Sequence, residues 1–82
     1  MLHRRKNMKL SDLKADSTGI IKSIGTDERF VNRITSVGLI EGTFFQVVRN
    51  DKKMPLLVFA RETLLALNRN DCGNIEVEEV KA

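Results

Sequence analysis

Residues 19–38 read GIIKSIGTDERFVNRITSVG, and this stretch decides the fold because it holds a strand and a helix separated by one glycine. Its first part, from Ile20 to Ile24, is rich in β-branched residues, and Gly19 and Gly25 flank it. β-Branched side chains pack well on a pleated surface, whereas glycines interrupt such runs. The first part is therefore predicted to form a strand that ends at Gly25.

The second part of the stretch predicts a helix over residues 27–37. Thr26 suits the N-cap position, and the acidic Asp27 and Glu28 would lie in the first turn, where the helix dipole favours negative charge. Apolar residues recur with the i, i+4, i+7 spacing of one helix face at Phe30, Ile34 and Val37. Gly38 follows and suits the left-handed position that ends many helices.

Outside this stretch, four further short strands are predicted, each bounded by turn residues. They cover residues 43–49, 56–60, 64–67 and 75–80. The first two of them form a predicted hairpin, and residues 68–73 read as a turn-rich connection. Near the start of the chain, Leu10 and Leu13 predict a short helical turn that plugs one end of the core. Five short strands with one helix predict a mainly β fold, a small closed or nearly closed barrel.

Length and charge limit the possible functions. The chain has 82 residues, which allow one domain with one core. The net charge is +3, and four positive charges lie at the start of the chain, on Arg4, Arg5, Lys6 and Lys9. From Leu10 onward, ten basic residues stand against eleven acidic ones. Because the body is near neutral and has no Tyr or Trp for base stacking, we expect no nucleic-acid partner, and an RNA-binding small barrel is kept as an alternative function.

The order of the segments divides the chain into a leader and a domain. Residues 1–8 are predicted to be a flexible basic leader, and residues 9–81 the folded domain. No continuous apolar stretch follows the basic residues, so the leader does not match an export signal, and no window reaches the ~20 apolar residues of a membrane span. The single Cys72 fits a reducing compartment. We therefore expect a cytoplasmic protein that reaches the inner face of a membrane only indirectly, through a partner.

The order and spacing of the segments over residues 8–80 resemble the ferrous iron transport protein A (FeoA) family. The residues that carry the resemblance are Leu10-Ser11-Asp12-Leu13-Lys14, Gly19-Ile20-Ile21 with Ile24, Arg33, Val37-Gly38-Leu39, Gly42, Pro55-Leu56-Leu57-Val58, Leu64-Leu65-Ala66-Leu67-Asn68 and Ile75-Glu76-Val77. Three features depart from the family pattern: residues 15–17 replace a usual Pro-Gly turn, the loop around Asp51 is short, and Arg61 stands where a glycine is common.

The resemblance implies an SH3-like β-barrel of about five strands with one α-helix. It also implies a cytoplasmic accessory or regulatory protein of ferrous iron transport, whose partner is a large membrane transporter with its own cytosolic GTP-binding domain. The chain itself shows no phosphate-binding glycine motif, because its five glycines are scattered. The GTP site would therefore belong to the partner.

Side chains for catalysis or metal binding are few. No histidine lies near the serines of the predicted domain to act as a base, so we do not expect an enzyme. His3 and Cys72 are the only soft metal ligands, whereas transition-metal sites gather three or four. No cofactor is therefore expected, and binding of Fe(II) or adventitious Zn(II) cannot be read from the sequence. An iron-sensing or metallochaperone module is the third hypothesis for the function.

Protein–protein binding is the mode of action that remains. Two arginines lie at i, i+4 on the predicted helix, away from its apolar stripe, where they can face an acidic partner. Adjacent Phe44 and Phe45 point to opposite sides of their strand, so one ring is expected outside. The candidate partner-binding residues are Arg29, Arg33, Phe44, Met54 and Leu64.

Overall fold

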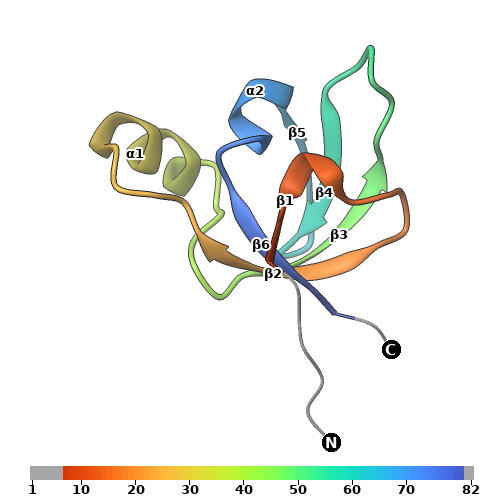
Figure 1. Cartoon of the computed structure of the whole chain (residues 1–82), viewed down its shortest axis with the longest axis horizontal. Helices are drawn as coiled ribbons and strands as arrows, with labels where there is room; N and C mark the ends of the chain where they lie inside the picture. The colour runs from red at the N-terminus through yellow and green to blue at the C-terminus, as the bar shows by residue number, and fades with distance from the viewer. Residues whose placement is uncertain (1–6, 81–82) are drawn as a thin grey trace, which may run out of the picture.

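The computed structural model describes residues 7–80, which form one six-stranded antiparallel sheet with short helical segments between strands (Figure 1). The strands are β1 Asn7–Lys9, β2 Thr18–Ser23, β3 Phe44–Arg49, β4 Leu56–Ala60, β5 Thr63–Leu67 and β6 Glu76–Val80. The helical segments are the 3-10 helix η1 Leu10–Asp12, α1 Glu28–Ser36 and α2 Arg69–Cys72. The predicted mainly β fold class is confirmed, and the five predicted strands are found within two residues at each end.

The strand order in the sheet is β1-β6-β2-β3-β4-β5, so β1 and β5 are its two edges. The connection from β2 to β3 carries α1, which lies on the opposite side of the molecule from the β3–β4 hairpin (Figure 1). The short α2 joins β5 to β6. The sheet is therefore not closed into a barrel by hydrogen bonds within residues 7–80, and it keeps two free edges.

The sixth strand, β1, is additional to the five strands that the sequence predicts. Its residues Met8 and Lys9 pair with Val77 and Glu76 of β6. Asn7 and Met8 fall within the range 1–8 that the sequence assigned to a flexible leader, so the ordered sheet begins two residues before the predicted boundary. Residues 1–6, with His3 and all the basic residues of the predicted leader, lie outside the described residues.

The core lies on one face of the sheet and is closed at one end by η1. The strand residues that point into it alternate with exposed neighbours: Ile21, Phe45, Val47, Leu56, Val58, Ala60, Leu67 and Val77. Leu10 and Leu13 are buried beside them, as predicted. The N–H of Leu10 donates to the carbonyl of Ile75 at 2.9 Å, and the amide of Asn50 donates to the carbonyls of Ser11 and Leu13. These bonds hold η1 against the sheet.

Helix α1 is one residue shorter at each end than the sequence predicts. Asp27, and not Thr26, is the N-cap, because its carboxylate accepts from the N–H groups of Arg29 and Phe30 at 3.0 and 3.4 Å. Val37 is the C-cap residue and is 44% exposed, so its predicted place on the buried stripe is wrong. The chain turns at Gly38, where φ is +104°, and buries Leu39 instead.

The segment predicted as a turn-rich connection contains α2. Asn68 caps it by accepting from the N–H of Asn70 at 2.8 Å. The guanidinium of Arg69 donates to the side chain of Asn50 at 2.6 Å and to the carbonyls of Asp51 and Met54. Helix α2 is thereby fastened to the loop between β3 and β4.

Candidate docking surface

Exposed apolar side chains lie on β3, β4 and β5, among them Phe44, Val48, Phe59 and Leu64. Strand alternation places Phe45 inside, with 1% of its surface exposed, and Phe44 outside, with 56% exposed. Phe59 on β4 and Leu64 on β5 are 44% and 56% exposed. The prediction that one ring of the Phe44-Phe45 pair is exposed therefore agrees with the structure, and neither α1 nor η1 covers that ring.

The register of the strands brings three of these side chains into one row. Phe59 lies directly opposite Leu64 across the β4–β5 ladder. On its other side, Phe59 faces Gln46, and Phe44 lies two residues before Gln46 on the same face. Directly opposed and diagonal side chains on one face are within reach of one another. Phe44, Phe59 and Leu64 thus form a continuous feature, which we call the apolar strip.

Met54 lies away from this strip. It is 48% exposed, but it belongs to the loop between β3 and β4, where its carbonyl accepts from Arg69. That loop borders the end of β4 where Leu56 pairs with Leu67, whereas Leu64 lies near the opposite end of the hairpin. The structure therefore brings together Phe44 and Leu64 from the predicted set and places Met54 elsewhere.

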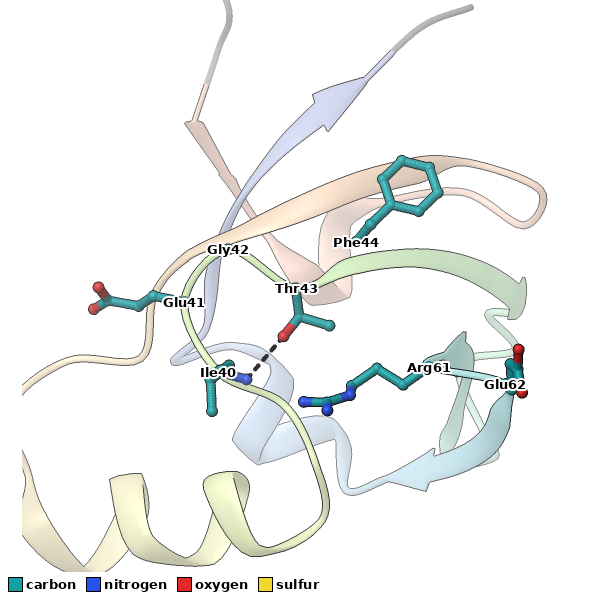
Figure 2. Close-up of a pocket in the computed structure, with 7 residues that line it drawn as sticks. All are labelled: Ile40, Glu41, Gly42, Thr43, Phe44, Arg61 and Glu62. Carbon is teal, nitrogen blue, oxygen red and sulfur yellow. Dashed lines mark hydrogen bonds between the residues drawn. The ribbon is translucent and has the colours of Figure 1, made fainter.

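A pocket of about 570 Å³ adjoins the strip (Figure 2). Its lining residues come from the turn before β3 and from the turn between β4 and β5: Ile40, Glu41, Gly42, Thr43, Phe44, Arg61 and Glu62. Hydrogen bonds hold the first turn, since the hydroxyl oxygen of Thr43 accepts from the N–H of Ile40 at 3.1 Å. Gly42 has φ of +91°, and its N–H donates to the carbonyl of Ile21 at 2.8 Å. This wall of the pocket is thus fixed to β2.

The opposite wall is a strained turn with a cationic side chain. Arg61 and Glu62 join β4 to β5 with φ values of 53° and 63°. Two-residue hairpin turns of this kind favour Asn-Gly, because a left-handed backbone costs other residues about 1–2 kcal/mol each. Within residues 7–80, the guanidinium of Arg61 has no hydrogen-bond or ion-pair partner. It extends toward Ile40 and Thr43, while the carboxylates of Glu41 and Glu62 point away (Figure 2).

The two arginines of α1 have different surroundings. Arg33 donates to the carboxylate of Asp71 on α2 at 2.8 Å, and its guanidinium lies 5.4 Å from the centre of the Phe30 ring. It therefore links the two helices within the molecule. Arg29 is exposed in the first turn of α1. The role of both residues in partner binding stays a prediction.

Cys72 is fully buried in α2. Burial raises the pKa of its thiol to about 11, with nearby Asp71 adding to the rise and Arg69 opposing it. The thiol is thus protonated at neutral pH, and it is the thiolate that binds metals. In the part of the chain that the structure describes, no three His, Cys, Asp or Glu side chains gather in an arrangement that could hold a metal ion.

Three residues of this surface are not predicted from the sequence: Phe59, Ile40 and, as a binding group, Arg61. The sequence of β4 gives no signal for Phe59, because its five residues are all apolar, and only the structure shows that Val58 and Ala60 on either side of Phe59 are buried. Ile40 lies in the turn between α1 and β3, and the start of that turn was not predicted correctly because α1 ends one residue earlier than expected. In the sequence Arg61 stands out only as a departure from the family pattern, and the position of its guanidinium in the pocket depends on where the turn before β3 lies in space.

Comparison with known proteins places this fold in a family. The FeoA domain matches residues 8–79. The crystal structure of an iron uptake regulatory protein (FeoA) superposes with a TM-score of 0.86 at 20% identity, covering 92% of this chain and all of that one. The solution structure of FeoA from Chlorobium tepidum gives 0.79 at 29% identity, covering 90% of this chain and 71% of that chain. No match is found among curated protein sequences.

The same fold occurs within larger proteins. A manganese-dependent transcriptional repressor superposes with a TM-score of 0.83 at 15% identity, and the match covers 96% of this chain but 45% of the repressor. That likeness concerns the fold alone. None of the helices in residues 7–80 has the length and apolar character to cross a membrane. The SH3-like fold is confirmed, and because the FeoA domain matches nearly all of its length, the chain belongs to the FeoA domain family.

Proposed function

We propose that this chain is a small cytoplasmic accessory protein of ferrous iron transport that acts by binding and not by chemistry. Its partner is the cytosolic GTP-binding domain of a ferrous-iron transporter, through which it reaches the membrane indirectly. Membership of the FeoA domain family and the likeness to an iron uptake regulatory protein support the link to iron. The accessory role and the partner follow from the family resemblance.

The apolar strip, beside the pocket that Arg61 lines, is the observation that supports action by binding. Exposed aromatic side chains on a rigid sheet, next to a cation, are typical of the few residues that supply most of the energy of an interface. Phe44 and Phe59 project from central strands, so their backbone is already ordered, and each aromatic side chain has only two χ angles to fix on binding. The strip fits an apolar partner surface, and Arg61 fits an acidic side chain at its border.

The test is an NMR titration of the isotope-labelled chain with the GTP-binding domain of its host's transporter, with and without nucleotide. We expect amide shifts at Phe44, Phe59, Arg61 and Leu64. Replacing Phe44 with alanine should weaken binding about tenfold or more, because interface aromatics cost at least 1–2 kcal/mol when truncated. Met54→Ala removes a similarly exposed side chain away from the strip and serves as the control.

The outcomes of this titration are distinct. No shifts at high partner concentration would reject direct docking on that domain. Shifts confined to α1 and the Met54 loop would move the docking site off the strip. The RNA-binding alternative predicts instead that RNA shifts the spectrum with a steep dependence on salt, and the iron-sensing or metallochaperone alternative predicts stoichiometric Fe(II) in equilibrium dialysis.

A further inference from the structure

Strand β5 is an edge of the sheet that is open to pairing. Within residues 7–80, β4 is its only strand partner, and the turns and caps donate no backbone hydrogen bond to it. An edge strand presents a row of N–H and C=O groups that can pair with another extended chain.

The hairpin geometry shows which of these groups point outward. The two-residue turn makes Ala60 and Thr63 the closing hydrogen-bonded pair, and bonded pairs then alternate along an antiparallel ladder. Leu65 and Leu67 therefore bond to β4, whereas the N–H and C=O groups of Leu64 and Ala66 face away from it. The side chains of Leu64 and Ala66 are also exposed.

The open edge has none of the features that usually prevent edge pairing. The five residues of β5 read TLLAL, with no charge and no proline, and their register with β4 is regular. The other edge differs, since β1 has only three residues and ends at Lys9, whose ammonium group donates to the carbonyl of Gly73. The two edges of the sheet are thus unequally protected.

We propose that β5 pairs antiparallel with β5 of a second copy of this chain, forming a two-fold symmetric dimer centred on Leu65. In this register Leu64 of one copy faces Ala66 of the other, twice, so the outward groups make four backbone hydrogen bonds. The large and small side chains are complementary across each pair. Because β5 carries no charge, it does not favour a charged peptide as its partner. A second copy of β5 presents the same neutral, apolar strand.

The contact is small, which sets the strength of the dimer. Two five-residue strands that meet edge to edge bury less than the roughly 1,200 Å² of a stable interface. The dimer is therefore weak and reversible, forms at millimolar concentration and is dispersed at low micromolar concentration. It extends the sheet across the two-fold axis from β5 of one copy to β5 of the other.

The test compares the full chain at low micromolar and millimolar concentration by sedimentation equilibrium and by amide hydrogen exchange. We expect the mass to approach twice the monomer at high concentration, with exchange at Leu64 and Ala66 slowing at least tenfold while that of Leu65 stays unchanged. Ala66→Lys should weaken association about tenfold or more. Gln46→Lys adds the same charge to an exposed site on a central strand and should dimerise like the parent.

Three results would overturn the proposal. The first is a monomer at millimolar concentration with unchanged exchange at Leu64 and Ala66. The second is an equal loss of association in Gln46→Lys, which would implicate the sheet face and not the edge. The third is growth into larger oligomers, which would exclude a closed two-fold pair. Leu64→Lys provides a second edge variant in case Ala66→Lys unfolds, and circular dichroism verifies the fold of each variant.

Discussion

Arg61 has a strained backbone and a guanidinium that has no partner among residues 7–80, and this combination is typical of residues kept for binding. We predict that Arg61→Gly stabilises the protein by about 0.5–1 kcal/mol, because glycine removes the left-handed strain but has more freedom to lose on folding. The same substitution should weaken docking on the GTP-binding domain, because the pocket loses its cation. Urea unfolding and the NMR titration measure the two effects.

Glu62→Gly is the matched control for this prediction. Glu62 has the same left-handed backbone, but its carboxylate points away from the pocket (Figure 2). The variant should therefore gain similar stability and bind its partner as the parent does. Equal loss of binding in both variants would show that the turn conformation, and not the charge of Arg61, matters for docking.

The buried thiol of Cys72 makes stability depend on pH in the alkaline range. Its pKa is about 11 in the folded chain against 9.0 for the free group, so the folded state keeps its proton where the unfolded state has lost it. The resulting stability is fully present below pH 9 and is lost as pH rises toward 11. We predict that urea unfolding of the parent loses about 2 kcal/mol more than Cys72→Ala between about pH 8 and about pH 10.5. Parallel pH profiles for the two proteins would refute this.

At the scale of the elements, the packing of β2 on β3 depends on Gly19. It lies opposite Phe45, and a β-carbon at this position would come within 2.9 Å of the Phe45 ring and 2.8 Å of the Glu78 carbonyl. We predict that Gly19→Ala destabilises the protein by about 2–3 kcal/mol, because the ring and β6 must both shift. Thermal unfolding measures the loss.

Gly73→Ala is a suitable comparison for this substitution. A β-carbon there meets only the Asn70 carbonyl, at an ordinary 3.5 Å, and the backbone φ of −69° suits alanine. Its effect should be within about 0.5 kcal/mol of zero. A similar loss of stability in both variants would point to general sensitivity to glycine replacement, not to the contact with Phe45.

The elements that the sequence predicted are those with a local signal. β2, β3 and β4 have β-branched or aromatic runs between turn residues, and α1 has a clear apolar spacing. β1 could not be predicted, because Asn-Met-Lys has no strand character and is held by its pairing with β6. Likewise α2 depends on the contacts of Arg69 with the distant Asn50 loop.

The candidate surface was predicted only in part for the same reason. Alternation within one strand indicates that Phe44 or Phe45 is exposed, and the buried neighbours determine which. That Phe59 and Leu64 join Phe44 depends on the register between three strands, which no local pattern contains. The separation of Met54 from the strip is likewise a property of the folded hairpin.

At the scale of the whole molecule, the excess positive charge lies near the start of the chain, whereas the proposed docking surface lies on β3, β4 and β5. Removing residues 1–6 takes away Arg4, Arg5 and Lys6 and brings the net charge from +3 to 0, while β1 still begins at Asn7. We predict that any salt-sensitive binding of the full chain to RNA or heparin is lost in the shortened chain, because such binding follows the number of phosphates or sulfates neutralised. Its affinity for the GTP-binding domain should change less than about twofold, because the apolar strip and Arg61 remain. If RNA binding instead survives the deletion, the barrel itself must contact the phosphates, and the RNA-binding alternative would gain over the transporter.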